Sequence, residues 1–450
     1  MSKILIKGAT IINEGRSFVG SVIIDGDRIE EVIEGISSLN LEQQFDETVN
    51  AAGKYLVPGV IDDHVHFREP GLTDKADIPN ESRAAAAGGV TSYMEMPNTK
   101  PQTTTIEALD DKFERGANES RVNYSFYFGA TNSNYGLFHK LDKHRVCGIK
   151  VFMGSSTGNM LVDRQDALER IFGETDMLIA THCEDTDRIN ENIKKYKALY
   201  GDDPYITYHP MIRDAEACYA SSSKAVELAD KTGARLHVLH ISTAKELSLF
   251  TNKIPLKEKK ITAEAVIAHL LFYDDFYKSL GPLIKVNPAI KSLDDREELR
   301  QALIDNTIDV IGTDHAPHLL SSKTGGALGS ASGMPMVQFS LPIMVELAMN
   351  GVFTKEMVVE KMCHAPAELY HVDKRGYIRP GYWADIVLVD PNSEMKITAD
   401  IIQSKCAWSP LEGMTLHNTV TRTFVNGHTV YQNEAVVDDT YRGMALTFNY

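Results

Sequence analysis

The chain has 450 residues, with 46 Lys and Arg against 62 Asp and Glu, so its formal net charge is -16. Hydrophobic residues make up 43% and charged residues 24%, which is ordinary for a globular protein. The negative charge argues against nucleic acid or an anionic membrane surface as the main partner. An anionic small ligand would need a local cation in its binding site.

The cysteines are few and scattered, and they form no CxxC pair: Cys147, Cys183, Cys218, Cys363 and Cys406. This pattern favours reduced thiols, and with them a cytoplasmic location. The first residues lack the apolar core of a signal peptide, and no apolar run is long enough to span a bilayer. We therefore expect a cytoplasmic protein.

Both ends of the chain are predicted to be β-rich. Residues 3–12 and 21–33 are short β-rich runs, and Asp25-Gly26 favours a hairpin turn. Residues 384–390 and 421–431 have the same character near the other end. We predict that residues 1–55 and 376–450 together form one small β-sandwich.

The middle of the chain, residues 56–375, alternates between β-rich apolar runs and helical stretches. The helix predicted within 77–89 ends at a glycine pair. Eight strand–helix units over this length predict a (β/α)8 barrel. The eight predicted strands lie within residues 56–67, 91–96, 122–130, 146–153, 177–184, 235–242, 260–270 and 308–317.

Polar side chains with metal-binding chemistry fall on six positions of these strands. In a (β/α)8 barrel the carboxyl ends of the strands form the active-site face, so all six are expected to converge there. They are His64 and His66 on the first strand, Lys150 on the fourth, His182 on the fifth, His240 on the sixth and Asp314 on the eighth.

The spacing of His64 and His66 puts both imidazoles on one side of a strand, because side chains alternate along it. Two such imidazoles can bind one metal ion. Imidazole together with carboxylate favours Zn, with Fe, Mn, Co and Ni as alternatives. A packed or surface histidine pair would also explain this motif if it stood alone.

Lys150 lies in the apolar run 146–153, where a bare ammonium is unfavourable. One interpretation is an ammonium paired with Asp314 or another carboxylate. The other is a lysine whose pKa is lowered by burial near cations, so that the neutral amine adds CO2. The resulting carbamate is an anion with two oxygens and can bridge two metals.

Seven sequence blocks resemble the signatures of the amidohydrolase superfamily and, within it, of the dihydroorotases. The resemblance spans about residues 50–390. The blocks are PGVIDDHVHFREPG (58–71), AAAAGGVTSYMEMPNTKP (84–101), GIKVFM (148–153), ATHCED (180–185), HVLHIST (237–243), VNPAI (286–290) and GTDHAPH (312–318).

The resemblance implies a centre with two Zn2+ ions per subunit. In the family pattern one metal is held by His64, His66 and Asp314, and the other by His182 and His240. Carboxylated Lys150 and a hydroxide bridge the two. Asp314 also takes a proton from that hydroxide and returns it to the leaving nitrogen. His237 is assigned to packing or to support of His240.

Arg68 is the predicted cation for an anionic substrate. It follows His66 by two residues, so on an extended strand it points into the same mouth, where its guanidinium can bind a carboxylate. A surface arginine is the alternative. By resemblance, Asn98 and His318 hold the same carboxylate and Asn287 contacts a pyrimidine ring. The segment 154–160 lies where the family has a loop that closes over substrate, and this resemblance makes Thr157 a candidate substrate contact.

We therefore expect dihydroorotase activity: reversible cyclisation of N-carbamoyl-L-aspartate to (S)-dihydroorotate with release of water, the third step of pyrimidine synthesis. The alternatives are an allantoinase or a hydantoinase-type dihydropyrimidinase, and an inactive scaffold homologue. A scaffold would have lost metal ligands, whereas all six are present. The expected partners are a second copy in a homodimer and aspartate transcarbamoylase.

Two segments depart from the family pattern. The seventh predicted strand reads AEAVIAHLLF (263–272), where the family usually has a proline and two histidines, and only His269 remains. The segment 332–342 lacks the usual glutamate–threonine pair after its glycine. These two departures bear on the subgroup of the family and on the binding partners more than on catalytic activity.

Overall fold

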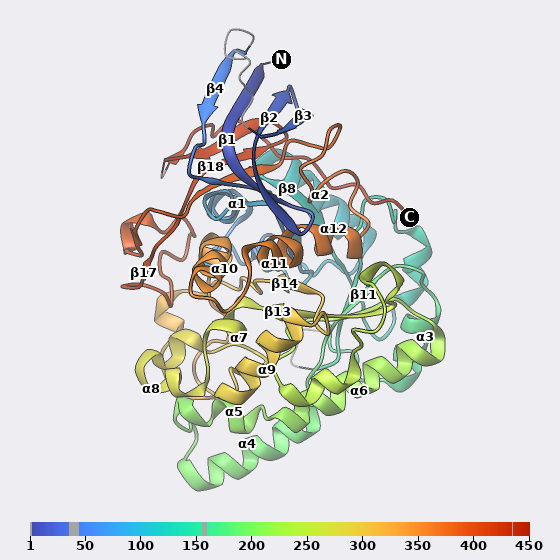
Figure 1. Cartoon of the computed structure of the whole chain (residues 1–450). Coiled ribbons are helices and arrows are strands. Elements are labelled where there is room, and N and C mark those ends of the chain that lie inside the picture. The colour runs from blue at the N-terminus through green and yellow to red at the C-terminus, as the bar shows by residue number, and fades with distance from the viewer. Residues whose placement is uncertain (1, 36–44, 155–159, 434) are drawn as a thin grey trace.

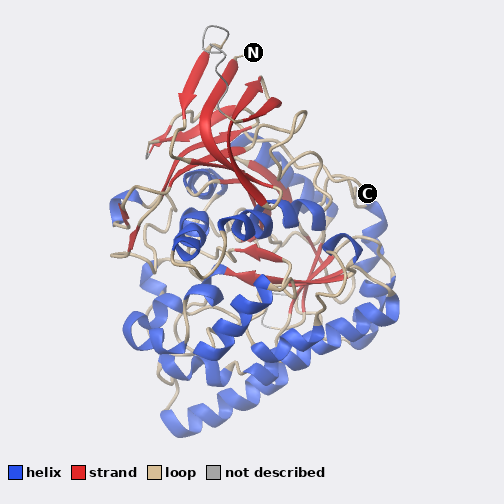
Figure 2. Ribbon diagram, viewed as in Figure 1, coloured by secondary structure: helices blue, strands red, loops and turns tan. Residues whose placement is uncertain are grey.

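The computed structural model describes residues 2–35, 45–154, 160–433 and 435–450 as a mixed α/β structure with helices around the lower strands (Figure 2). In these ranges, no helix has both the length and the apolar character needed to cross a membrane. The mixed α/β class expected from the sequence is confirmed.

Strands from both ends of the chain form one nine-stranded sheet, at the top of Figure 1. β5 lies between β1, with which it pairs in parallel, and β15, with which it pairs antiparallel. We predicted a sandwich; the hydrogen-bonded pairs join the two ends into one continuous sheet. Its strands are β1 (Lys3–Asn13), β2 (Arg16–Asp25), β3 (Arg28–Glu34), β4 (Glu47–Asn50), β5 (Tyr55–Pro58), β15 (Ile386–Asp390), β18 (Thr419–Val425), β19 (His428–Gln432) and β20 (Ala435–Val436).

The strands of the middle region pair in parallel with their neighbours in chain order. One sheet runs β6-β7-β8 and the other β9-β10-β11-β12-β13-β14. Each predicted strand run contains at least one of these strands, and the run 122–130 contains two, β8 and β9. They are β6 (Val60–Val65), β7 (Val90–Glu95), β8 (Asn123–Phe126), β9 (Phe128–Gly129), β10 (Ile149–Phe152), β11 (Ile179–His182), β12 (Leu236–Val238), β13 (Ile261–Val266) and β14 (Val310–Gly312).

Backbone and side-chain contacts connect the end of this series to its beginning. A parallel bridge joins Val65 to His315, and His66 N donates to the His315 carbonyl at 2.7 Å. Asp62 on β6 accepts hydrogen bonds from the backbone and the hydroxyl of Thr313, at 3.1 and 2.6 Å. The carboxyl ends of the first and last strands are therefore adjacent.

Helices follow most of the parallel strands. The first, α1, begins where Asp77 accepts from Asn80 N and ends before Gly88-Gly89, where Gly89 has a φ of 78°. The helices are α1 (Ile78–Ala87), α2 (Ile106–Glu119), α3 (Gln165–Gly173), α4 (Thr186–Tyr200), α5 (His209–Ile212), α6 (Ala215–Thr232), α7 (Ile267–Leu271), α8 (Tyr277–Leu280), α9 (Leu293–Ile304), α10 (Ser340–Met349), α11 (Lys355–Val359) and α12 (Ala365–Leu369). A short pair, β16 (Met395–Lys396) and β17 (Thr415–Leu416), completes the strands.

The structure divides the first predicted strand run, 56–67, at Gly59. Residues before Gly59 belong to β5 of the terminal sheet, and those after it form β6. A side chain at position 59 would lie about 2.0 Å from the Thr91 hydroxyl, so only glycine fits this crossing. The C-terminal tail also differs from the prediction, because Leu446 N donates to Tyr124 O beside β8 at 2.8 Å.

Candidate metal centre and active site

A single cavity of about 1190 Å3 brings the predicted residues together. Its walls come from loops and strand ends around the parallel strands, which places residues 250 positions apart in the sequence side by side. Among its lining residues are the six predicted metal ligands, His64, His66, Lys150, His182, His240 and Asp314, and four of the predicted substrate contacts, Arg68, Asn98, Asn287 and His318. Thr157 lies outside the described residues.

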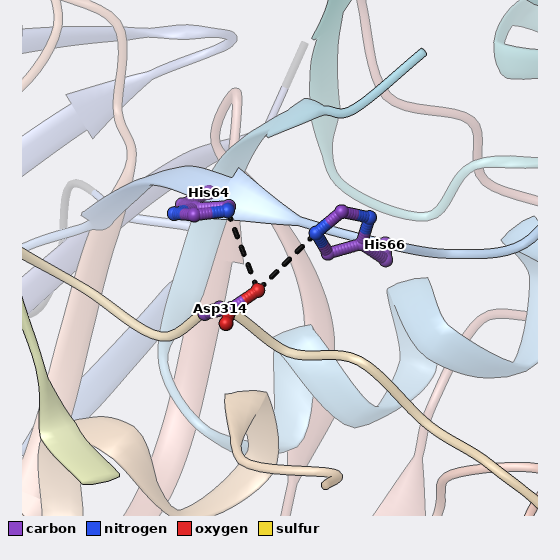
Figure 3. Close-up of side chains that lie close together, drawn as sticks. All are labelled: His64, His66 and Asp314. Atoms are coloured by element: carbon purple, nitrogen blue, oxygen red, sulfur yellow. Dashed lines mark ion pairs between the residues drawn. The ribbon is translucent and has the colours of Figure 1, made fainter. Parts of the chain in front are cut away.

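His64, His66 and Asp314 form a compact cluster (Figure 3). Asp314 Oδ1 lies 3.3 Å from His64 Nε2 and 3.2 Å from His66 Nε2. Their ligand atoms all lie within 4.8 Å of one another, so the cluster can hold one metal ion.

The outer nitrogens of these two rings have partners of their own. His64 Nδ1 lies 3.0 Å from Glu264 Oε2, and His66 Nδ1 lies 2.8 Å from Asn98 Oδ1. Burial lowers the pKa of both rings, so each is neutral, with its proton on Nδ1 facing an acceptor. Both Nε2 lone pairs then face a carboxylate oxygen. Three electron-pair donors directed at one another are an arrangement that a cation stabilises.

His182 and His240 form a second pair of candidate ligands. His182 Nδ1 lies 2.9 Å from His240 Nε2. The other nitrogen of His182 is 3.0 Å from Glu184 Oε2, which also accepts from Arg213. Burial opposes ionisation of Glu184, but Arg213 and His182 outweigh it and lower its pKa to about 2. A fully ionised glutamate therefore orients the His182 ring.

Lys150 lies beside these histidines with only 1% of its surface exposed. Burial lowers its pKa to about 8, although Asp314 and Glu264 act in the opposite direction. Among the described residues, no ion pair joins its ammonium to Asp314 or to another carboxylate; Nζ lies 4.8 Å from the Phe152 ring centre. The described part of the structure therefore lacks the ion pair between Lys150 and a carboxylate that the first interpretation predicts.

Three residues of the site have left-handed backbone conformations, which residues other than glycine rarely adopt. The φ values are 69° for Arg68, 40° for His240 and 46° for Asp314. Such strained residues cluster at functional sites, because the surrounding structure must hold them in place. Each lies just after a parallel strand, where the backbone turns its side chain into the cavity.

Arg68 supplies a cation in the cavity wall and lies beside the neutral ring of His318, whose pKa burial and Arg68 lower to about 2. Arg68 Nε donates to Pro317 O at 3.1 Å, and Nη2 lies 3.2 Å from His318 Nε2. Burial lowers the pKa of Arg68 to about 10, so it remains charged at neutral pH. Asn287 adds a buried amide oxygen that has no hydrogen-bond partner within the described structure. A substrate N–H would satisfy it.

Sequence reasoning did not identify the carboxylates that support the histidines. Glu264 accepts from His240 N at 2.6 Å as well as facing His64, and so connects the two histidine pairs. Glu184 falls two residues after His182, a spacing that indicated its place on the same side. His237 is fully buried and lies 3.3 Å from Asp63 Oδ2, outside the cavity lining, which agrees with a packing role.

Comparison with known proteins identifies the family. The amidohydrolase family pattern matches residues 55–430. The chain belongs to the amidohydrolase family. Curated amidohydrolase relatives named dihydroorotase include one from Halobacterium salinarum, 34% identical over 431 residues, covering 95% of this chain and 96% of the relative. Another, from Wolbachia sp. subsp. Brugia malayi, is 32% identical over 423 residues, covering 92% of each chain.

Solved structures of cyclic amidohydrolases share the fold. An L-hydantoinase (dihydropyrimidinase) from Arthrobacter aurescens superposes with a TM-score of 0.93 at 26% identity, covering 99% of this chain and 100% of the other. A dihydropyrimidinase from Brevibacillus agri superposes with a TM-score of 0.87 at 23% identity, covering 100% of both chains. The latter likeness concerns the fold alone.

Proposed function

We propose that this amidohydrolase is a dihydroorotase, which interconverts N-carbamoyl-L-aspartate and (S)-dihydroorotate. Relatives of that name match nearly the whole chain, as described above. The observation that carries the choice is the buried guanidinium of Arg68 in the wall of the metal-site cavity. Dihydroorotate has a ring carboxylate, whereas hydantoins and dihydropyrimidines lack one. Among the described residues Arg68 forms no ion pair, so a substrate carboxylate would be its counter-ion, whereas a neutral ring would leave its charge unpaired.

We also propose two Zn2+ ions per subunit. His64, His66 and Asp314 hold one, His182 and His240 hold the other, and a carboxylated Lys150 joins them. Bound zinc would polarise the amide carbonyl and acidify the attacking water. Two observations support this assignment. The lone pairs of His64 and His66 face Asp314, and the Lys150 amine lines the same cavity as both histidine pairs.

Within this site, the protein's own groups orient the substrate and move a proton. Arg68, Asn98 and His318 hold the ring carboxylate, and Asn287 receives a ring N–H. Asp314 takes the proton of the attacking water and delivers it to the leaving nitrogen in hydrolysis; cyclisation reverses the transfer.

The proposal also covers the domain architecture, the cellular location and assembly, and the type of partner. We propose that the two parallel sheets form one (β/α)8 barrel over residues 56–375, with a β domain made of 1–55 and 376–450; the bridge between Val65 and His315 supports this arrangement. The chain acts in the cytoplasm as a homodimer, with association with aspartate transcarbamoylase as a further possibility to test by co-purification. Its substrate is a small anion, so no nucleic acid or membrane is required.

Replacing Arg68 with methionine should cripple turnover of both carbamoyl aspartate and dihydroorotate. Loss of a desolvated, charge-assisted contact is worth roughly 2–5 kcal/mol of transition-state stabilisation. Steady-state kinetics of the metal-loaded enzyme on dihydroorotate, allantoin and dihydrouracil provide the measurement. Arg296→Met, which removes an arginine outside the cavity lining, is the control. Better wild-type turnover of either neutral ring would contradict the assignment.

Replacing Glu264 with glutamine should weaken metal binding roughly 10–100-fold, which is typical when a group supporting a ligand is lost. Both His64 Nδ1 and His240 N lie against the same oxygen, Oε2, and a neutral amide oxygen in that place is a weaker acceptor than a charged carboxylate. Competition with a chelating dye measures the affinity. Glu246→Gln, another buried glutamate outside the cavity lining, is the matched control. Equal affinities for the wild type and Glu264→Gln would refute this role.

A further inference from the structure

The cavity extends beyond the groups assigned above to a mouth between two loops, residues 68–75 and 97–102. The loops are packed tightly: Lys100 N donates to Pro70 O at 2.9 Å, and a side chain at Gly71 would lie about 1.9 Å from Lys100 O. Lys75 and Lys100, one from each loop, line this part of the cavity. The contact therefore fixes the two loops that carry Lys75 and Lys100 relative to each other.

The three side chains differ in burial: Lys100 is exposed, Lys75 is partly buried, and Arg68 is buried. Burial lowers the pKa of Lys75, and the positive charges of Arg68 and Lys100 lower it further, while Asp74 opposes them. Lys75 also lowers the pKa of His318. Lys75 therefore lies within electrostatic reach of both Arg68 and Lys100.

Arg115 also lines the cavity, and unlike the two lysines it has carboxylate partners in the described part of the chain. Arg115 forms ion pairs with Asp111 at 2.8 Å and Glu69 at 3.2 Å. Among the described residues, neither Lys75 nor Lys100 forms an ion pair, although the chain carries a net charge of -16. Unpaired cations at the mouth of a cavity in an acidic protein concentrate anions there.

We propose that Lys75 and Lys100 form an outer anion site at the cavity mouth, which attracts the carboxylates of the substrate toward Arg68. The choice of ligand rests on the proposed function. The open-chain substrate carries two carboxylates and the cyclic one carries one. A site that acts through its electric field stabilises a ligand in proportion to the ligand's charge, so the open-chain form benefits most.

The test compares two non-cyclising probes of similar shape and different charge: N-acetyl-aspartate, a dianion, and N-acetyl-asparagine, a monoanion. Their dissociation constants are measured by calorimetry on the metal-loaded wild type and on Lys75→Gln/Lys100→Gln. The control, Lys253→Gln/Lys257→Gln, removes two exposed charges outside the cavity lining. Binding is measured without turnover, so failure of this inference is distinguishable from failure of the proposed activity.

We expect the mouth variant to weaken the monoanion about threefold and the dianion about tenfold at low salt, as for two partly exposed charge contacts. At 1 M salt, where the screening length is about 3 Å, the difference from wild type should vanish. The control should bind both probes as the wild type does. Equal losses for both probes, a loss that persists at 1 M salt, an equal loss in the control, or no binding by the wild type would each overturn the proposal.

Discussion

Replacing Lys150 with alanine should abolish activity and bound metal together. Lys150 is 1% exposed among the histidines, and burial lowers its pKa to about 8, so the neutral amine that reacts with CO2 is readily available. Carboxylation converts a cation that repels two dications into an anion that binds both. Metal and CO2 should therefore bind cooperatively, and removing the amine should remove this coupling.

The measurements are metal content by mass spectrometry and the rate of dihydroorotate hydrolysis. Short carboxylic acids such as acetate or propionate should partly restore both in Lys150→Ala, because they replace the missing carbamate. Lys285→Ala is the control: Lys285 is also buried, with a pKa lowered to about 8, but it does not line the cavity. Carboxylic acids should not change its activity.

Reconstitution of the wild type provides an independent check. Adding metal in buffer freed of bicarbonate should restore activity slowly, and adding bicarbonate should accelerate recovery. Full activity in CO2-free buffer, together with a structure that has an unmodified Lys150 and no second metal, would refute the carbamate.

Replacing Asp314 with asparagine should lower turnover about 10²–10⁴-fold, the usual contribution of a positioned acid–base group. Asparagine keeps an oxygen near His64 and His66, but it cannot accept the proton of the attacking water. The metal held by His182 and His240 should remain, because neither histidine contacts Asp314 directly.

The experiment measures turnover and metal content on the same preparation of Asp314→Asn. Asp305→Asn, an exposed aspartate at the end of α9, is the matched control and should retain both. Near-normal turnover in metal-replete Asp314→Asn would rule out Asp314 as the proton carrier. Loss of all metal would show instead that the two metal positions depend on each other.

Much of the fold was predictable from local patterns. Each predicted strand run contains a parallel strand, because a buried parallel strand needs a continuous apolar run whatever it packs against. The boundary at Gly59 was not predictable, since the run continues through it and only contact with Thr91 separates β5 from β6. The sequence predicted one β domain from both termini, but not its strand order with β5 between β1 and β15, because strand order depends on long-range pairing.

The sequence by itself determined the chemical types and local spacing of the site residues. The alternation of a strand puts His64 and His66 on one side, and a polar residue at a strand end stands out against an apolar run. Tertiary structure alone decided what surrounds them. Glu264 meets His64 across 200 positions, and the loop that carries Lys75 packs against Lys100 at Pro70 and Gly71. The reason is physical: local patterns fix which way a side chain points, whereas its partners, its burial and its pKa depend on which distant segments fold against it.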